Sequence, residues 1–363
     1  MSARQRTRLT LLRLAGALLT ARQRRGPESR REPTQVAPVG GRSGTPRILL
    51  VRPDHLGDAL LAGPAGHLLA AALPSAEVDW LVGPWAAEVI RRSGQRGRIL
   101  TCDFPGFTRR PKSTVWGPYR TLLNEAARLR ARRYDIAVIL RPDHWWGALL
   151  AATAGIPRRI GYASPESAPF LTDALPPPGA IHAVTANLAL ARHAARVLDA
   201  TSSVPTTAPS FVVADEERAW ARDILSGIMS PGEPLIAAHP GSGADVKNWL
   251  PERWTAVARQ LGARIGAQLV LTGGPAEAAL VERIAAGLAP RPPTLAGQTT
   301  LGQLAALFER CALVLGGDSG PLHLAAAVGT PTVRVYGPTS RDIFGPWGAP
   351  AIHAAIQANL PCQ

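Results

Sequence analysis

Cysteine, lysine and long apolar runs are all scarce in this chain of 363 residues. The three cysteines, Cys102, Cys311 and Cys362, lie far apart without a Cys-x-x-Cys pair, which argues against a disulfide framework or a zinc site and favours a reducing compartment. The 35 glycines and 34 prolines interrupt every apolar segment before it reaches the about 20 residues that cross a bilayer, which argues against an integral membrane protein. The remaining class is an ordinary globular chain, long enough for two domains.

Positive charge is in excess, and it is unevenly placed. The net charge is +14, with a sequence pI of about 11.1. Eleven arginines and two glutamates among residues 1–47 account for +9 of it, so the rest of the chain carries only +5. A basic surface over a whole domain would favour a nucleic-acid-binding protein, which is the non-enzymatic alternative. A basic appendage on a nearly balanced body argues against that alternative, and we expect no nucleic-acid partner.

Residues 1–46 are interpreted as a basic flexible leader. Six leucines between positions 9 and 19 lie among arginines, a composition typical of a short helix that rests on an anionic membrane. Arg13 interrupts this apolar stretch, so we do not expect a cleaved signal peptide. The interpretations that remain open are a peripheral membrane contact through residues 1–46, a disordered arginine-rich leader, and a misassigned start codon.

From residue 47 onwards, short apolar runs alternate with helical stretches. Residues 47–51 are almost continuously apolar, as strands buried on both faces of a parallel sheet are. The first helix is expected at residues 60–73, and further strands at 78–82, 98–101, 136–140, 159–161, 235–238, 268–272, 294–296, 312–315 and 332–335. This alternation predicts an α/β protein with two doubly wound domains, residues 47–205 and 206–363. Ligands of such sheets bind beyond the carboxyl ends of the strands, so the loops there should carry the chemistry.

The loop after the first strand concentrates polar side chains in the sequence RPDHLGD, residues 52–58. A carboxylate at this place can accept a proton from a hydroxyl, or it can cap the helix that follows. On composition alone, the N-cap role of Asp58 is the stronger of the two.

Three loops of the second half are rich in glycine and polar residues. The sequence HPGSGADVK, residues 239–247, offers backbone N–H groups and Lys247, one of only two lysines in the chain, to a diphosphate. It lacks a Walker A motif and a complete Gly-x-Gly-x-x-Gly. The sequence GGDSGPLH, residues 316–323, opens a helix whose N-terminus suits an anion. Asp318 would repel phosphate, so we expect it to accept hydrogen bonds from sugar hydroxyls. The loop after the last strand reads YGPTSRD, residues 336–342.

In this order, RPDHLGD, HPGSGADVKNWLPERW, GGDSGPLHLAAAVGTPTV and YGPTS resemble the heptosyltransferases, glycosyltransferase family 9, over residues 47 to about 350. The resemblance implies the GT-B fold, two Rossmann-like doubly wound domains facing across a cleft. It also implies an inverting transfer of a sugar from a nucleotide-diphosphate donor, ADP-heptose in most members, to a cell-envelope glycan or glycolipid acceptor. No metal and no further cofactor are expected, and the expected location is cytoplasmic, at the inner face of the cytoplasmic membrane.

The resemblance also implies roles for single residues. Asp58 matches the catalytic carboxylate that takes the proton of the acceptor hydroxyl. Lys247 matches the lysine that neutralises the leaving diphosphate. The remaining donor-binding positions are Ser242, Gly243, Asp318, Ser319, Gly320 and His323. Gly243 departs from the hydroxyl-bearing residue of the family, and Gly274-Pro275 stand where many members have an acidic residue.

The candidate residues for acceptor binding come from the sequence alone and not from the family resemblance. Basic and aromatic side chains are mixed in residues 103–120, and a second loop, RPDHWW, follows the strand at 136–140. The candidates for acceptor binding are His55, Arg109, Arg110, Lys112, Arg120 and Arg141; an exposed basic loop with aromatic anchors is the competing interpretation. Among enzymes, the alternative to a glycosyltransferase is another GT-B enzyme of nucleotide sugars, such as a UDP-sugar epimerase.

Overall fold

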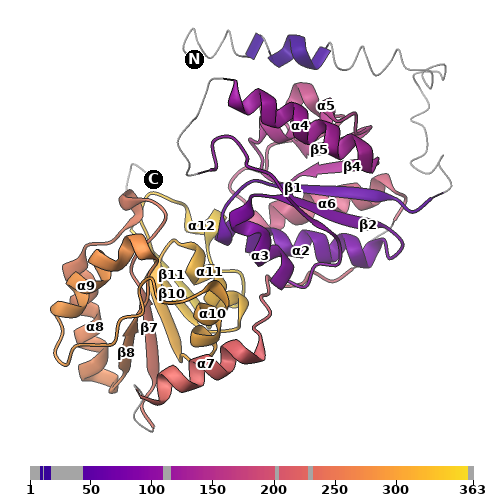
Figure 1. The fold of residues 1–363 in the computed structure, drawn as a ribbon. Helices are drawn as coiled ribbons and strands as arrows, with labels where there is room; N and C mark the ends of the chain where they lie inside the picture. Colours follow the sequence, from indigo (N-terminus) through magenta and orange to yellow (C-terminus); the bar gives the residue numbers. More distant parts are fainter. Residues whose placement is uncertain are drawn as a thin grey trace, which may run out of the picture. The chain divides into compact units, whose positions relative to one another are not determined.

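A computed structural model describes residues 9–10, 12–17, 44–108, 116–200, 204–227 and 232–358. They form two compact units, each with its own parallel sheet (Figure 1). Unit 1 takes the described residues of 1–55, 62–91 and 95–207. Unit 2 takes those of 208–363 together with the short stretches 56–61 and 92–94.

The sheet of unit 1 has six parallel strands in the order β3-β2-β1-β4-β5-β6. Its strands are β1 (Arg47–Arg52), β2 (Glu77–Val82), β3 (Ile99–Thr101), β4 (Ile136–Ile139), β5 (Arg158–Tyr162) and β6 (Asp173–Leu175). Successive strands add to one side of β1 and then to the other, so the chain order reverses between β1 and β4. This switch point is where an open α/β sheet offers room for a ligand.

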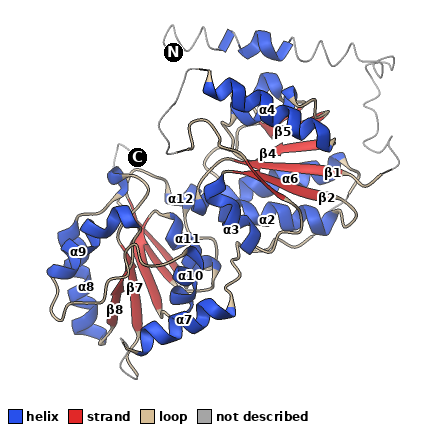
Figure 2. Cartoon of the chain, in the orientation of Figure 1, coloured by secondary structure: helices blue, strands red, loops and turns tan. Residues whose placement is uncertain are grey.

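Helices cover both faces of the unit 1 sheet (Figure 2). They are α2 (Leu56–Ala72), α3 (Ala87–Arg92), α4 (Gly117–Arg132), α5 (Trp145–Thr153) and α6 (Ala183–Val197), with 3-10 turns at Pro84–Ala86 and Ala168–Phe170. Alternate strand residues such as Leu49, Val51 and Ala137 pack with apolar residues of α4 and α5 in one buried cluster. Helices cover both faces of the sheet, and the side chains of a strand point alternately to the two faces. Consecutive residues of β1 are therefore all buried, which explains its unbroken apolar run.

Unit 2 repeats this architecture with five parallel strands in the order β11-β10-β9-β7-β8. The strands are β7 (Leu235–His239), β8 (Gln268–Leu271), β9 (Leu313–Gly317), β10 (Thr332–Tyr336) and β11 (His353–Gln357). The helices are α7 (Asp215–Ser226), α8 (Pro251–Ile265), α9 (Ala278–Ala286), α10 (Leu301–Glu309), α11 (Gly320–Ala327) and α12 (Arg341–Phe344), with 3-10 turns at Asp245–Lys247 and Pro275–Glu277. The switch point here lies between β7 and β9.

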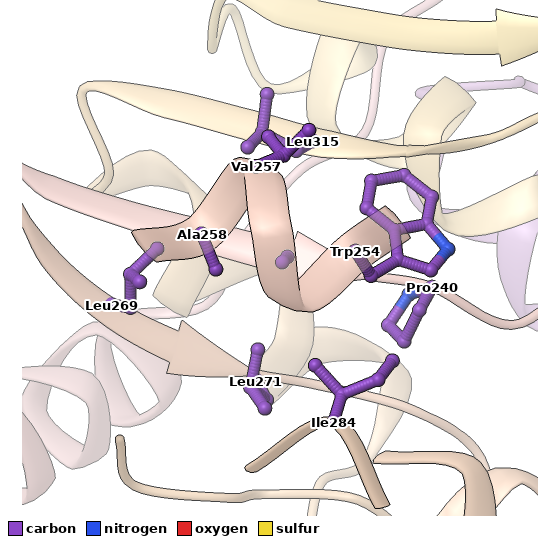
Figure 3. Close-up of a pocket in the computed structure, with 9 residues that line it drawn as sticks. Pro240, Trp254, Val257, Ala258, Leu269, Leu271, Ile284 and Leu315 are labelled. Atoms are coloured by element: carbon purple, nitrogen blue, oxygen red, sulfur yellow. The ribbon is translucent and has the colours of Figure 1, made fainter. Parts of the chain in front are cut away.

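A small cavity of about 10 Å³ lies under α8 in the core of unit 2 (Figure 3). Trp254 and Ala258 of α8 meet Leu271 of β8 and Leu315 of β9 around it. The volume is about that needed for one water molecule, far below that of a sugar nucleotide. The cavity is therefore too small to hold a sugar nucleotide.

Several expected elements differ in the structure. The helix expected at 60–73 begins at Leu56, because the turn after β1 is only three residues long. The strand expected at 294–296 is wrong: Thr294 forms a single bridge with Leu271 and no ladder follows. The strand β6 at one edge of its sheet, β11 at the edge of the other, and the four-residue α12 were not predicted, because short segments carry little periodic signal.

The described part of the leader packs against the protein. Residues 9–10 and 12–17 are helical, and Leu12 and Ala15 contact the core cluster of unit 1. Gly16 is buried and packs so closely against Pro169 that an added Cβ would lie 2.6 Å from the Pro169 carbonyl oxygen. The membrane contact predicted for residues 1–46 is therefore not supported in this part, where two apolar side chains are covered by protein, although Leu14 is exposed. The other leader residues up to 43 lie outside the described residues.

No helix among the described residues is long and apolar enough to span a bilayer.

Candidate active site

The loop after β7 places Lys247 at the switch point of unit 2. Ser242 has its hydroxyl 2.8 Å from both the Ala244 carbonyl oxygen and Oδ1 of Asn248. A hydroxyl has one proton, so it donates to one of them at a time. Gly243 is exposed beside it, and the chain then enters the 3-10 turn that ends at Lys247. These contacts give the loop a defined shape without a long helix or strand.

Lys247 forms an ion pair with Asp318, which follows β9. The ammonium Nζ lies 2.7 Å from Oδ2 of Asp318, and the Thr339 hydroxyl donates to the same oxygen at 2.7 Å. The Asp318 side chain is 8% exposed and that of Lys247 is 29% exposed. Water therefore reaches the cation more readily than the carboxylate. A diphosphate arriving at this loop would meet an ammonium already held at the carboxyl edge of the sheet by a buried counter-ion.

The first turn of α11 follows directly. Ser319 is the N-cap residue, yet its hydroxyl makes no capping hydrogen bond and has no partner among the described residues although it is buried. Gly320 is the first residue of the helix. Unpaired donors at a helix N-terminus can accept an anion, and the unpaired Ser319 hydroxyl adds one more donor there.

His323 lies one turn into α11 and is fixed by a buried arginine of β10. Nη1 of Arg334 lies 3.1 Å from Nδ1 of His323, and Nη2 donates to the Leu322 carbonyl oxygen at 2.9 Å. Burial lowers the pKa of the Arg334 guanidinium, which is fully covered. A guanidinium only donates, so Nδ1 of His323 accepts and we assign its proton to Nε2. The buried arginine therefore selects one tautomer of a predicted donor-binding residue.

An acidic residue that the sequence analysis missed completes this edge of unit 2. Oε2 of Glu277 accepts the Gly274 N–H at 2.6 Å and lies 3.4 Å from Nε2 of His239, whose Nδ1 lies 3.0 Å from the Thr272 hydroxyl. Glu277 therefore places a carboxylate three residues after Gly274. The sequence does contain a signal for this contact, namely the spacing. A glutamate three residues after a helix N-cap residue often accepts a hydrogen bond from the N–H of that residue. At Gly241 an added Cβ would approach the Glu277 carboxylate to 2.2 Å, so a larger residue there would displace this side chain.

Asp58 lies in the first turn of α2. The N-cap residue is His55, which makes no side-chain capping bond, and Asp58 is the third residue of the helix. The N-cap interpretation of Asp58 is therefore wrong, because the helix begins earlier than its apolar pattern suggests. Asp58 is half-buried there, and a negatively charged side chain in the first turn interacts favourably with the positive end of the helix dipole.

The carboxyl edge of the unit 1 sheet contains the same four residues twice. Arg-Pro-Asp-His follows β1 at residues 52–55 and β4 at residues 141–144. Nε of Arg52 lies 2.7 Å from Oδ2 of the buried Asp54, and the Arg141 guanidinium binds the other oxygen of the same carboxylate. Nε of Arg141 also contacts Asp143 at 2.6 Å. Burial alone would raise the pKa of Asp54, but the two guanidinium groups hold it below its usual value. The two neighbouring turns thus form one charge network.

The imidazole of His144, the last residue of the second turn, is buried without a hydrogen bond to a described residue. Neither ring nitrogen has a partner among the described residues. Phe104 and Phe107 pack edge-on against its ring, with centroids at 5.3 and 5.5 Å, and Trp146 stacks at 6.5 Å. Burial lowers the pKa of His144 from 6.5 to about 3. The imidazole is therefore neutral in the folded protein throughout the physiological range.

This low pKa predicts acid sensitivity with a defined sign. Between pH 6.5 and about 3, the unfolded chain binds a proton at His144 that the folded chain does not bind. The free energy of unfolding should therefore fall as the pH drops through this window, by about 1.4 kcal/mol per pH unit for one proton. Urea unfolding at several pH values should show a shallower dependence in His144→Phe than in the parent. Asp54, whose pKa is also lowered, leaves a residual slope of the same sign. Equal slopes in the two proteins would contradict the assignment.

The candidate acceptor residues lie in different environments. His55 packs against Trp85, with ring centroids 5.2 Å apart, and the Trp85 indole donates to the Asp54 carbonyl oxygen at 2.9 Å. Arg141 is one-third exposed and lies over the Phe107 ring at 5.1 Å. Arg120 is exposed on α4. Arg109, Arg110 and Lys112 lie outside the described residues.

The aromatic residues of the segment 103–120 divide into two groups. Phe104 and Phe107 turn inward onto His144, whereas Trp116 and Tyr119 are exposed at the start of α4. The segment is therefore no single aromatic surface. Among the described residues, no group of three or more His, Cys, Asp and Glu side chains is placed to hold a metal ion.

Two Rossmann-like parallel sheets, each with polar and charged groups at its carboxyl edge, are the elements of the GT-B fold. The model of glycosyltransferase family 9 (heptosyltransferase) matches residues 123–363, and the chain belongs to this family. It is 28% identical to lipopolysaccharide heptosyltransferase 2 of Escherichia coli over 83% of this chain and 85% of that protein. It is 26% identical to lipopolysaccharide heptosyltransferase 1 of Pseudomonas aeruginosa over 87% of this chain and 85% of the relative.

Solved structures show the same fold. The family 9 glycosyltransferase of Veillonella parvula superimposes with a TM-score of 0.73 at 24% identity, over 87% of this chain and 86% of that one. The structure of E. coli ADP-heptose lipopolysaccharide heptosyltransferase II gives a TM-score of 0.68 at 25% identity, over 87% and 92%.

Proposed function

We propose that this glycosyltransferase moves a heptose from ADP-heptose to a glycolipid acceptor of the lipopolysaccharide core, with inversion at the anomeric carbon. The observation that carries the proposal is the ion pair of Lys247 with Asp318 at the carboxyl edge of the unit 2 sheet, next to Ser319, whose hydroxyl has no partner among the described residues. A diphosphate fits this edge because it offers anionic oxygens to an ammonium and to a helix N-terminus. The names of the relatives supply the sugar and the class of acceptor.

In the proposed reaction, Asp58 takes the proton of the acceptor hydroxyl while that oxygen attacks the anomeric carbon. The bond from this carbon to the diphosphate oxygen breaks, and its electron pair leaves with the nucleotide. Lys247 exchanges part of its contact with Asp318 for the diphosphate and stabilises the developing charge. One base and one stabilised leaving group are enough for inversion, whereas retention would need a carboxylate nucleophile. In this proposal no metal takes part, and the reaction occurs at the cytoplasmic face of the membrane.

The proposed donor predicts a ranking of thermal shifts. With ADP-, GDP-, UDP- and dTDP-linked sugars at equal concentration, ADP-heptose should raise the melting temperature most. A ligand at about 100 times its Kd adds about 2.7 kcal/mol to the free energy of unfolding. Lys247→Ala should lose most of this shift, and Asp58→Asn should keep it because its carboxylate serves the acceptor.

The same panel distinguishes the alternative enzyme. A largest shift with a UDP-sugar, together with conversion of that sugar without any acceptor, would replace the proposal by an epimerase. A largest shift with ADP-heptose and product formation only when a lipopolysaccharide-core acceptor is added would support it.

A further inference from the structure

Strand β10 has one polar face that is buried, with Arg334 at its centre. Thr332, Arg334 and Tyr336 are spaced two residues apart, so they point to the same face of the sheet, and all three are buried. Arg334 has no exposed surface at all. The alternate residues Val333 and Val335 pack on the apolar core cluster of the other face. A strand inside a parallel sheet is usually apolar on both faces, so a fully buried arginine here is unusual.

The Arg334 guanidinium fixes His323 in the first part of α11. Its Nη1 donates to Nδ1 of His323 at 3.1 Å and its Nη2 donates to the Leu322 carbonyl oxygen at 2.9 Å, so it holds two consecutive residues of the helix. Its Nε lies 3.4 Å from the Thr332 hydroxyl. With Nδ1 occupied as an acceptor, a neutral His323 carries its proton on Nε2, which then only donates. A cation at Nδ1 also polarises the ring and strengthens the hydrogen bond that Nε2 donates.

Arg334 has no carboxylate of its own. It forms no salt bridge within the part of the chain that the structure describes, and the three hydrogen-bond partners given above are neutral groups. Asp318 acts on Arg334 electrostatically, but this carboxylate is already paired with Lys247 at 2.7 Å. Two cations therefore share one buried carboxylate near the start of α11. Because a buried cation is costly without a counter-ion, an anion that binds at this edge of the sheet gains from both cations.

We propose that Arg334 is a positioning residue for donor binding, which holds His323 as a hydrogen-bond donor to the diphosphate of the nucleotide sugar. Arg334 does not contact the donor itself, because its side chain is fully covered, and it acts through His323. The Ser319 hydroxyl, buried and without a partner among the described residues, offers a second donor at the N-cap of the same helix. The inference rests on the proposed function, which supplies the nucleotide diphosphate.

A second buried arginine provides a matched control. Arg159 of β5 is 3% exposed, and it too forms no salt bridge with a described residue. Its guanidinium donates to the carbonyl oxygens of Phe170 and Ile156, both at 2.6 Å. Arg159 therefore holds backbone groups of unit 1, whereas Arg334 holds the side chain of a predicted donor-binding residue. Replacing either arginine removes a buried guanidinium from a strand, but only one replacement changes the surroundings of His323.

The test is titration calorimetry of the full chain with ADP and with UDP. Arg334→Met should weaken binding of the preferred nucleotide by about tenfold, because a hydrogen bond to a charged group is lost or misdirected. Arg334→Lys should recover part of this loss, since an ammonium keeps the charge and can donate to Nδ1 of His323. Arg159→Met should leave the nucleotide affinity unchanged. An unchanged affinity in Arg334→Met, or an equal loss in Arg159→Met, would overturn the proposal.

A double-variant cycle with His323→Ala shows whether Arg334 acts through the histidine. If it does, Arg334→Met should add little to the loss of affinity that His323→Ala already causes, so the two losses are not additive. Losses that simply add would overturn the proposal, because Arg334 would then act on the nucleotide by another route. If Arg334→Met does not fold, Arg334→Lys takes its place in the same cycle.

Nucleotide binding and sugar transfer separate this inference from the proposed function. A parent that prefers UDP, or that binds ADP but transfers no heptose, would refute the proposed function. The cycle measured with the preferred nucleotide would still decide the role of Arg334, because it requires binding of a diphosphate and no transfer. A parent that binds neither nucleotide would overturn both, since this edge of unit 2 would then hold no diphosphate.

Discussion

Asp58→Asn should lower the rate of sugar transfer by about 10²- to 10⁴-fold, the usual contribution of a general base. The amide is isosteric with the carboxylate but cannot accept the acceptor proton. The loss should appear in single-turnover transfer at saturating donor, and the donor-induced thermal shift should remain. A rate within a few-fold of the parent would require a different base.

The control for this variant is Glu88→Gln. Glu88 is also a half-buried acid in the first turn of a helix, α3, so its replacement removes the same favourable interaction with a helix dipole. It should cost about 0.3–1 kcal/mol of stability and leave transfer intact. If Glu88→Gln slowed transfer as much as Asp58→Asn, the effect of Asp58 would be structural.

Lys247→Ala should lower transfer by about 10²- to 10³-fold, because the leaving diphosphate loses its ammonium. The same change leaves the Thr339 hydroxyl as the only hydrogen-bond partner of the buried Asp318 Oδ2 among the described residues, and this should cost about 1–3 kcal/mol of stability. Steady-state kinetics and urea unfolding measure the two losses separately.

A double variant separates catalysis from folding at this pair. In Lys247→Ala with Asp318→Asn, the buried carboxylate is removed together with its counter-ion, so the stability should recover part of the loss. Transfer should stay low because the ammonium is still missing. Recovery of transfer together with stability would show that Lys247 serves only to neutralise Asp318.

The strands could be predicted from sequence because their signal is local. Runs such as residues 48–51 and 235–238 are apolar over four consecutive positions, which suits a strand buried on both faces of its sheet. The same reasoning misplaced the start of α2, because the apolar pattern begins at Leu60 while the backbone turns into the helix at Leu56. It also gave residues 294–296 a strand, where only Thr294 pairs with a neighbour.

The ion-pair partners of the predicted site residues could not be predicted from local sequence patterns. Lys247 and Asp318 are 71 positions apart, and Arg141 and Asp54 are 87 apart. Each pair meets because two strands are neighbours in the sheet, and strand order leaves no trace in local periodicity. The repeated Arg-Pro-Asp-His was visible in the sequence, but its meaning as one network depends on β1 lying beside β4.

The sequence by itself determined the two α/β domains, the glycine-rich loops at the strand ends and the family, because each depends on residues close together in the chain. Only the tertiary structure decided that Lys247 is held by Asp318 and Thr339, that Glu277 returns to Gly274, and that part of the leader packs on unit 1. These contacts depend on which strands become neighbours and which surfaces are buried. Burial and ion pairing are properties of the whole folded chain, and they decide which charged side chains lie close together at the proposed site.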